Sequence, residues 1–380
     1  MKKIKKNLFK VITLVGTRPE LIKLSCVIKK LDKYFNHYLI HTGQNYDYNL
    51  NEIFFKDLNI RKPDYFLKIK SQTASQAISK VIASTDNIIK KIKPDAFVVY
   101  GDTNSCLSAL AAKKNNIPIF HMEAGNRCFD DRVPEEVNRR LIDHISDINL
   151  VLSEHARRNL INEGIKVDNI FKTGSHMFEV IENNINKIKN SLILKKLGIN
   201  HKKYFLISLH REENVDNKDK LQKLINMIDD IKRNYKNYKI IFSTHPRTQK
   251  NIKNFETKIN KNNINFLKPF NFSDYCNLQK NSYCTISDSG TIFEEASILK
   301  FPAITLRDAH ERLEGIDSGS VVLSNYNDKN FLNKIELSIN EFDKQTYTED
   351  YNYNNVSSKV VKIISGYINF VNNKTYYKEI

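Results

Sequence analysis

Acidic and basic residues gather in the stretch HMEAGNRCFDDRVPEEVNRR, residues 121–140, directly after a run that is typical of a buried strand. Glu123 comes at the end of that predicted strand, and Glu135 stands at the start of the next predicted helix. Acids near a helix start are also typical of simple complementation of the helix dipole, which suits Glu136. Two carboxylates in different surroundings are what acid–base chemistry at C–H and C–O bonds requires. Glu123 and Glu135 are therefore candidates for proton transfer.

Charged residues also stand at the ends of two other predicted strands. The turn GTRPELIK, residues 16–23, opens a helix, and its Arg18 and Lys23 can meet an anion there. The turn lacks the glycine spacing of a dinucleotide-binding site, and a plain strand-to-helix turn remains an alternative. Asp102 follows the strand at 95–100 and could act as a base or orient one, although an acid there is equally typical of a helix N-cap.

Two histidines follow predicted strands in the second half of the chain. His210 lies in SLHREEN and His245 lies in STHPRT. A single histidine of this kind is more often packed in the core or solvated, whereas two at parallel strand ends that face one cleft favour a shared role. His210 could bridge or protonate a leaving group.

The segment SDSGTIFEEA, residues 287–296, combines a strand end, a Ser-Gly-Thr turn and a helix start. Exposed backbone N–H groups at such a helix start can hold a diphosphate without a metal ion. Glu295 could bind ribose hydroxyls, and RDAHER, residues 307–312, supplies further cations. A capping box between Thr291 and Glu294 would satisfy the same N–H groups internally. The spacing of Asp, His and Glu predicts no metal site.

The chain has 380 residues, a formal net charge of +17 and 41% hydrophobic residues, which fits a globular protein of two domains. Lysines are spread over the whole chain without a nucleic-acid-binding module, so nucleic acid is not an expected partner. No apolar run approaches the roughly 20 residues of a membrane span, and the N-terminus imitates a signal peptide only as far as Gly16. Five cysteines without a C-x-x-C pair favour a reducing, cytoplasmic location.

Apolar runs alternate with longer helical patterns, which predicts an α/β fold built on parallel sheets. The predicted strands fall at 10–16, 37–43, 95–102, 117–125, 148–154, 169–175, 204–210, 238–246, 282–290 and 301–308. A polar, weakly patterned region at about 179–203 is the expected domain boundary. We expect an N-terminal Rossmann-like domain over 1–180 and a C-terminal one over 190–360. A final helix at 360–380 is expected to pack back on the first domain.

Seven motifs occur in the order typical of the non-hydrolysing UDP-N-acetylglucosamine 2-epimerase family, which the chain closely resembles from about residue 10 to about residue 325. These motifs are GTRPELIK, GDTNS, HMEAGNRCFD, PEEVNR, HREEN, SDSGTIFEEA and RDAHER. The resemblance implies the GT-B fold, in which two Rossmann-like, doubly wound domains hold the active site in the cleft between them. It also implies a UDP-sugar substrate and a homodimer.

The chemistry implied by the resemblance is epimerisation at C2 of a UDP-linked 2-acetamido sugar. The C2 hydrogen is not acidic, because no carbonyl group stands beside it. The family instead eliminates UDP across C1–C2, which leaves a glycal, and adds UDP back with the C2 proton on the other face. Positive groups must stabilise the leaving diphosphate, and carboxylates must stabilise the oxocarbenium-like centre. No cofactor is expected.

The resemblance assigns roles to individual positions. Asp102, Glu123 and Glu135 match acids for proton transfer and cation stabilisation, and His210 matches a histidine near the diphosphate. Which acid acts on which face stays open. The predicted substrate-binding set, with Tyr275 at the uracil and Glu295 at the ribose, is Arg18, Lys23, Arg127, His245, Tyr275, Ser289, Gly290, Thr291, Glu295 and Arg312.

The chain departs from the family's N-acetylglucosamine members at AGNRCFD, at HREEN and at Thr291. These departures resemble the branch that makes UDP-N-acetyl-L-fucosamine from UDP-2-acetamido-2,6-dideoxy-L-talose for capsule or O-antigen. Cys128 and Phe129 would suit the apolar methyl group of a 6-deoxy sugar. The stretch HTGQNYDYNLNEIFF keeps only part of a pattern that elsewhere holds an allosteric UDP-sugar, so such regulation is not expected.

Several alternatives share parts of this pattern. Conversion of UDP-N-acetylglucosamine to UDP-N-acetylmannosamine would use the same elimination. A GT-B glycosyltransferase would use the same UDP site with a separate acceptor, and a hydrolysing epimerase would release free sugar and UDP. A nucleotide-sugar sensor would need neither Glu123 nor Glu135.

Overall fold

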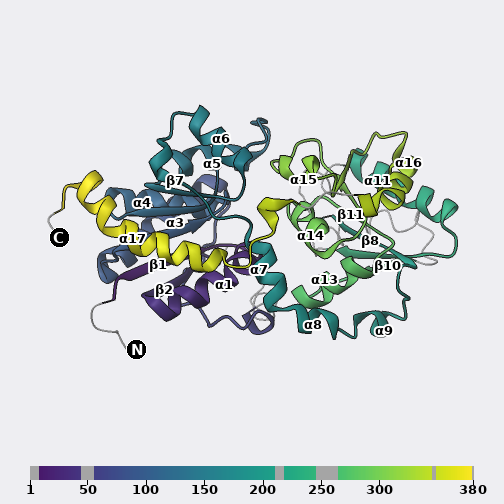
Figure 1. Cartoon of the computed structure of the whole chain (residues 1–380), viewed down its shortest axis with the longest axis horizontal. Helices are drawn as coiled ribbons and strands as arrows, with labels where there is room; N and C mark the ends of the chain where they lie inside the picture. The colour runs from purple at the N-terminus through teal and green to yellow at the C-terminus, as the bar shows by residue number, and fades with distance from the viewer. Residues whose placement is uncertain (1–7, 44–54, 210–217, 245–263, 345–347, 379–380) are drawn as a thin grey trace. The chain divides into compact units, whose positions relative to one another are not determined.

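A computed structural model of the chain describes residues 8–43, 55–209, 218–244, 264–344 and 348–378. The chain divides into two compact units, one made of Met1–Asn183 with Asp350–Ile380 and the other of Asn184–Glu349. Each unit is built on one parallel sheet. In Figure 1 the yellow helix α17 (Val356–Tyr376) lies along the purple and blue elements of the first unit, although it is the last helix of the sequence.

The sheet of the first unit has seven strands in the order β3-β2-β1-β4-β5-β6-β7, and neighbouring strands run parallel. This order places β1, β4 and β5 side by side, so that their carboxyl ends meet at one edge of the sheet. The strands are β1 (Lys10–Val15), β2 (Asn36–His41), β3 (Tyr65–Phe66), β4 (Ala96–Tyr100), β5 (Ile119–Ala124), β6 (Ile148–Val151) and β7 (Ile170–Lys172).

Two groups of helices cover this sheet. Helices α3, α4 and α5 share a core cluster with strand residues such as Ile12 and Phe97, while α1, α7 and α17 pack against one another. Because both faces are covered, strands such as β4 are apolar and buried at every position. The helices are α1 (Arg18–Tyr34), α3 (Ala74–Ile92), η1 (Asn104–Ser108), α4 (Ala109–Lys114), α5 (Pro134–Ile145), α6 (Glu154–Asn162), η2 (Val167–Asn169), α7 (His176–Asn183) and η4 (Glu349–Tyr351).

Helix α17 is attached to the first unit at both of its ends. At its start, the backbone N–H of Ser357 donates to Glu179 Oε2 at 2.8 Å, and the Ser357 hydroxyl donates to the other oxygen of the same carboxylate. At its end, the hydroxyl of Tyr376 donates to Asp147 Oδ2 at 2.9 Å. A buried carboxylate at a helix start satisfies free N–H groups and complements the helix dipole. Glu179 therefore anchors α17.

The second unit contains a six-stranded sheet in the order β10-β9-β8-β11-β12-β13, again with parallel neighbours. One core cluster joins β8 to α11 and α16, and another joins the opposite face of β8 to α9 and α13. The strands are β8 (Tyr204–Leu209), β9 (Lys239–Thr244), β10 (Ile264–Leu267), β11 (Cys284–Ser287), β12 (Ala303–Leu306) and β13 (Val322–Ser324). The helices are α8 (Ile185–Lys189), α9 (Ile193–Leu197), α11 (Lys218–Asn234), α13 (Phe272–Asn281), α14 (Ile292–Leu299), α15 (Leu313–Asp317), α16 (Phe331–Asn340) and η3 (Phe342–Lys344).

The α/β class and the two parallel sheets are confirmed, and each of the ten predicted strands overlaps a strand of the structure. The sequence missed β3, β10 and β13, which have two to four residues each. It also described 179–203 as weakly patterned, whereas the structure has α8, α9 and the end of α7 there. Sparse buried anchors, such as Ile188 and Ile193, are sufficient to fix such short helices. Within the described ranges, no helix combines the length and the apolar character that a membrane crossing requires.

Replacement of Glu179 by alanine should lower the free energy of unfolding by roughly 3 kcal/mol, because two donors of Ser357 lose a buried charged acceptor. Urea unfolding followed by circular dichroism measures this change. Glu182→Ala is the matched control, since Glu182 is an exposed carboxylate of the same helix. Equal effects of the two substitutions would contradict the anchoring role of Glu179.

Candidate active site

The carboxyl edge of the first sheet brings together three turns that the sequence singled out. These turns follow the adjacent strands β1, β4 and β5 and begin at Gly16, Gly101 and Gly125, and Glu123 is the second-last residue of β5. A Cβ built on Gly16 would lie 1.9 Å from the Ser105 hydroxyl oxygen, so only glycine allows the first two turns to approach so closely.

Glu20, which the sequence analysis did not select, joins two of these turns. Its carboxylate accepts the backbone N–H groups of Gly16 at 2.5 Å and Thr17 at 3.3 Å, and the hydroxyl of Thr103 at 2.7 Å. Burial raises the pKa of Glu20 from an ordinary value of 4.5 to about 7, although these hydrogen bonds act in the opposite direction. The capping-box spacing of Thr17 and Glu20 is the signal that could have found it.

Glu123 and Lys23, both predicted site residues, lie in direct contact. Lys23 Nζ donates to Glu123 Oε2 at 2.5 Å, and the side chains are only 8% and 10% exposed. The hydroxyl of Tyr100 donates to the same oxygen. Glu123 has a left-handed backbone with φ of 67°, at a point where the pairing of β5 with β6 shifts register. Such strained positions gather at functional sites, and this one turns the carboxylate away from the regular strand direction.

Asp102 is held by an arginine of the next helix. Arg139 Nε donates to Asp102 Oδ2 at 2.7 Å, and Arg139 Nη1 donates to Glu136 Oε2 at 2.8 Å. The Asp102 side chain is 21% exposed, whereas that of Glu136 is fully buried. Arg139 therefore bridges a partly exposed acid and a buried one, and this arrangement orients Asp102 at the edge of the sheet.

Glu136 also fixes the loop that follows β5. It accepts the backbone N–H groups of Cys128 and Phe129 at 3.1 Å each, and the Cys128 thiol donates to it at 3.3 Å. Burial alone would raise the pKa of Glu136, but the Cys128 and Arg139 hydrogen bonds outweigh it and the pKa is lowered. Glu136 is thus an ionised support of the loop and of Arg139, beyond the dipole complementation that its position in the first turn suggested.

Arg127 lies inside a network of buried charges. Its guanidinium donates to Asp143 Oδ2 at 2.7 Å and, through two nitrogens, to Glu163 at 2.7 and 2.6 Å. Asp143 also accepts the backbone N–H of Gly125 and lies 2.8 Å from His121 Nδ1. The Arg127 side chain is 0% exposed, so its contacts brace the turn after Glu123, and the predicted contact to substrate stays a prediction.

Glu135 and Arg18 lie at the starts of two helices. Glu135 is exposed in the first turn of α5, next to the buried Glu136. Arg18 is half-buried as the first residue of α1, directly after the turn at Gly16. Both residues therefore stand at the helix starts that follow strands of the first sheet.

In the second unit, the predicted diphosphate turn lies between β11 and α14. The hydroxyls of Ser289 and Thr291 are 2.9 Å apart. Thr291 is the N-cap of α14 and makes no side-chain capping hydrogen bond, so the capping-box alternative is wrong. A Cβ built on Gly290 would lie 2.8 Å from Glu311 Oε1, and Arg307 pairs with that carboxylate at 2.7 Å. The first N–H groups of α14 point to Ser289: the N–H of Thr291 donates to the Ser289 hydroxyl and the N–H of Ile292 donates to the Ser289 carbonyl, at 3.4 Å each.

The remaining predicted residues of this unit lie around α14. Glu295 is 6% exposed and accepts from the Gln279 side chain at 2.5 Å. Arg312 is 1% exposed and lies 3.5 Å from the Glu294 carboxylate. Tyr275 is half-buried, and both burial and the Glu295 carboxylate raise its pKa. Glu295 and Tyr275 are therefore close enough to interact electrostatically.

Two predicted histidines, His210 and His245, lie outside the described residues, and so do the HREEN motif and the HPRT part of STHPRT. In the ranges that the structure describes, no three His, Cys, Asp or Glu side chains gather as metal ligands.

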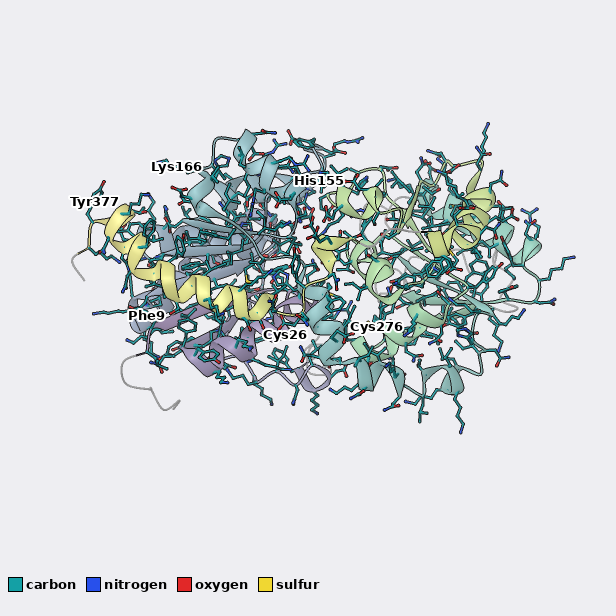
Figure 2. All side chains as sticks on the ribbon, viewed as in Figure 1. Phe9, Cys26, His155, Lys166, Cys276 and Tyr377 are labelled. Carbon is teal, nitrogen blue, oxygen red and sulfur yellow. The ribbon has the colours of Figure 1, made fainter. Side chains whose placement is uncertain are left out.

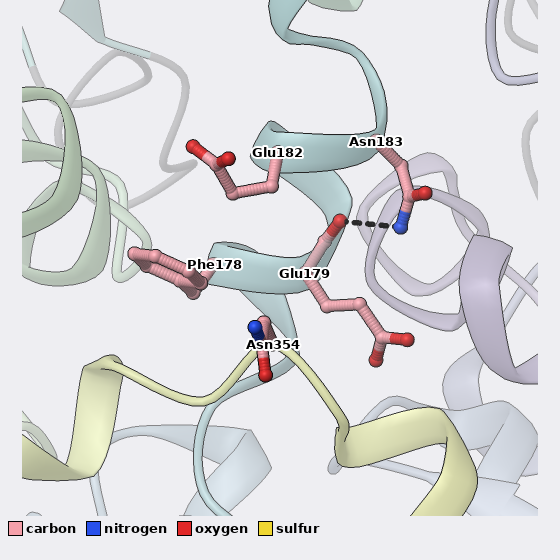
Figure 3. A pocket seen from close by; sticks show the side chains of 5 residues that line it. All are labelled: Phe178, Glu179, Glu182, Asn183 and Asn354. Atoms are coloured by element: carbon pink, nitrogen blue, oxygen red, sulfur yellow. Dashed lines mark hydrogen bonds between the residues drawn. The ribbon is translucent and has the colours of Figure 1, made fainter.

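A pocket of about 380 Å³ lies on the first unit and does not include any of the predicted site residues. Figure 3 shows its lining, with the carboxylates of Glu179 and Glu182 directed to different sides of α7; the lining residues are Phe178, Glu179, Glu182, Asn183 and Asn354. Glu179 is already used as the anchor of α17.

All five cysteines are free, and four of them are buried. Figure 2 labels Cys26 on α1 and Cys276 on α13 among the other side chains. Burial raises the pKa of the Cys26 thiol to about 11 and that of Cys284 to about 12. These thiols are therefore protonated and unreactive near neutral pH.

Comparisons with known proteins identify the family of the chain. A family model described as UDP-N-acetylglucosamine 2-epimerase matches residues 29–365. The structure of UDP-N-acetylglucosamine 2-epimerase from Rickettsia bellii is 48% identical with a TM-score of 0.91, over 98% of this chain and 100% of that one. A Methanocaldococcus jannaschii UDP-GlcNAc 2-epimerase in complex with UDP-GlcNAc and UDP is 37% identical with a TM-score of 0.87, over 94% and 99% of the chains. A UDP-2,3-diacetamido-2,3-dideoxy-D-glucuronate 2-epimerase of Pseudomonas aeruginosa is 34% identical over 83% of this chain and 88% of that protein.

The raised pKa of Glu20 predicts a pH-dependent stability. The pKa of Glu20 in the folded state is about 7, above its ordinary value of 4.5. The contribution of Glu20 to the free energy of unfolding is therefore complete below pH 4.5 and is lost as the pH rises through 7. Between pH 4.5 and 7, the wild type should lose up to about 3 kcal/mol of unfolding free energy relative to Glu20→Gln. Urea unfolding at several pH values measures the difference, with Glu182→Gln as the control; parallel curves for wild type and Glu20→Gln would contradict it.

Proposed function

Since the chain belongs to the UDP-N-acetylglucosamine 2-epimerase family, we propose that it is a non-hydrolysing isomerase that inverts C2 of a UDP-linked 2-acetamido sugar. The observation that supports this best is the Glu123 carboxylate. It stands at the carboxyl edge of the sheet with Lys23 and Tyr100 on one oxygen, and Asp102 follows the adjacent strand. Two acids with different partners suit a reaction that removes and returns a proton.

The proposed reaction proceeds by elimination and re-addition. The C1–O bond to UDP breaks with its electron pair going to the diphosphate, C2 loses its proton to a carboxylate, and a C1–C2 double bond forms. UDP then adds back to C1 while a proton reaches the opposite face of C2, so that all atoms return to the product. Glu123, Asp102 and Glu135 are the proposed proton-transfer and cation-stabilising groups, because carboxylates stabilise an oxocarbenium-like centre.

UDP is proposed to bind through the second unit. The start of α14, with Ser289, Gly290 and Thr291, offers N–H groups and the positive end of the helix dipole to the diphosphate. Glu295 is proposed for the ribose hydroxyls and Tyr275 for the uracil ring. Further cationic or polar contacts to the nucleotide and sugar are proposed for Arg312, Arg18, Arg127, His210 and His245.

For the sugar, we propose that UDP-2-acetamido-2,6-dideoxy-L-talose is converted to UDP-N-acetyl-L-fucosamine. The support is the loop AGNRCFD, in which Phe129 is 70% exposed and Cys128 is held by Glu136, so that the loop presents an apolar ring at its surface. Conversion of UDP-N-acetylglucosamine is the second candidate, because relatives of 37–48% identity are named for that sugar. A glycosyltransferase remains the alternative of another class.

The proposed product would supply surface polysaccharide such as capsule or O-antigen, and the proposed location is the cytoplasm. Five free thiols fit a reducing compartment, and nucleotide sugars are the activated donors that such synthesis consumes.

Incubation with candidate UDP-sugars in D2O, followed by NMR, tests the function. We expect deuterium at C2 with the UDP link intact, first with the L-talose derivative, and a loss of at least about 100-fold in Glu123→Gln because the base is removed. Glu182→Gln, an exposed glutamate on α7, is the matched control and should keep full activity. Stoichiometric free UDP would indicate hydrolysis, transfer to an acceptor would indicate a glycosyltransferase, and protium retained at C2 with every sugar would reject the proposal.

A homodimer is proposed through the outer face of α4 and α5. Val137 and Leu141 are 47% and 50% exposed at i,i+4 spacing on α5, and Leu110 on the adjacent α4 is 40% exposed. Light scattering after gel filtration should give twice the chain mass of 44.3 kDa for the wild type. Leu141→Asp should reduce the measured mass to that of one chain, because dimerisation would bury the charge of the aspartate in the interface. Leu337→Asp, at an exposed leucine of α16, is the control, and an unchanged mass in Leu141→Asp would contradict the interface.

A further inference from the structure

Tyr100 contacts Glu123 and comes two residues before Asp102, and the sequence analysis gave it no role. It is the last residue of β4, is 3% exposed, and directly precedes Gly101 and Asp102. In the parallel pairing of β4 with β5, Tyr100 lies opposite Met122, the residue before Glu123. The tyrosine thus lies where the strands of Asp102 and Glu123 end side by side.

The hydroxyl of Tyr100 and the ammonium of Lys23 are directed to the same carboxylate oxygen. Both donate to Glu123 Oε2, and Lys23 Nζ also lies 5.3 Å from the centre of the Tyr100 ring. On another side, the His176 ring meets the Tyr100 ring edge-on at 5.3 Å. The phenol is therefore fixed by packing before it donates, which makes it a rigid partner for the carboxylate.

The second oxygen of Glu123 has different surroundings. Its Oε1 lies beside the turn that leads from β4 to Asp102, because a Cβ built on Gly101 would be 3.8 Å from that oxygen. A base must present an oxygen within hydrogen-bond reach of the proton that it removes. Donors gathered on Oε2 fix the rotation of the carboxylate and hence the direction of Oε1.

We infer that Tyr100 is a positioning residue that holds Glu123 through Oε2 so that Oε1 addresses C2 of the sugar. This inference rests on the proposed function, in which Glu123 exchanges the C2 proton. The hydroxyl acts through the carboxylate and does not touch the sugar. Because a misplacement of about 1 Å can cost about 100-fold in rate, loss of this single donor should affect turnover more than binding.

A matched tyrosine, Tyr376, contacts the same sheet at the amino ends of its strands. Tyr376 donates to Asp147 at 2.9 Å, and Asp147 accepts the backbone N–H of Ile119, the first residue of β5. Tyr376→Phe therefore removes the same chemical group from a tyrosine–carboxylate pair in the same unit, far along β5 from Glu123. Its effect on the fold should resemble that of Tyr100→Phe.

The test compares wild type, Tyr100→Phe and Tyr376→Phe for C2 deuterium exchange over a range of pH. Tyr100→Phe should lower kcat by about 10- to 100-fold with KM within about twofold. The acidic limb of its pH–rate profile should move to higher pH, because the Glu123 carboxylate is protonated more readily once it loses a hydrogen-bond donor. Tyr376→Phe should keep both the wild-type kcat and the wild-type pH profile. Unchanged kcat and profile in Tyr100→Phe, or equal losses in both variants, would overturn the inference.

A second measurement separates this inference from the proposed function. Wild-type protein that leaves C2 unlabelled with every UDP-sugar would overturn the proposed function itself. In that case the carboxyl titration of Glu123 is followed by 13C NMR of glutamate-labelled protein, with the signal assigned by its loss in Glu123→Gln. A higher Glu123 pKa in Tyr100→Phe than in Tyr376→Phe supports the inference that the Tyr100 hydroxyl holds the Glu123 carboxylate. Equal pKa values in the two variants overturn it. Circular dichroism confirms that each variant is folded.

Discussion

The buried ion pair between Arg127 and Asp143 is the constraint on which the arrangement of the acids depends. Both side chains are 0% exposed, and Asp143 also accepts the backbone N–H of Gly125. A buried charge without its partner destabilises the fold by several kcal/mol, so Arg127 and Asp143 must be buried together. Because Gly125 directly follows β5, the pair fixes the turn from which Glu123 projects with its left-handed backbone.

Each acid at the carboxyl edge of the sheet has its own partners. Glu123 faces an ammonium and a phenol, while Asp102 faces the guanidinium of Arg139, which is itself fixed by the buried Glu136. The partners of Glu123 belong to α1 and β4, and those of Asp102 belong to α5. A parallel sheet brings these elements to one edge, which explains how carboxylates far apart in sequence obtain different surroundings within one site.

The sequence predicted what depends on local patterns, namely the buried strands, the turn at Gly16, Glu123 near the end of β5 and Asp102 after β4. It missed the partners that complete the site, because they come from distant segments: Tyr100 contacts Glu123 across 23 residues, and Arg139 contacts Asp102 across 37. No single-sequence spacing shows such pairs. It also missed β3, β10 and β13, whose two to four residues give no measurable periodicity.

In the proposed reaction, UDP leaves C1 and returns while C2 exchanges its hydrogen with solvent. Positional isotope exchange tests it directly, with a UDP-sugar that carries 18O in the bridge between C1 and the β-phosphorus. Free rotation of the released diphosphate should move the label into the non-bridging positions of the β-phosphate, which 31P NMR detects, in parallel with deuterium entry at C2. Deuterium entry with the label kept entirely in the bridge would contradict elimination and re-addition.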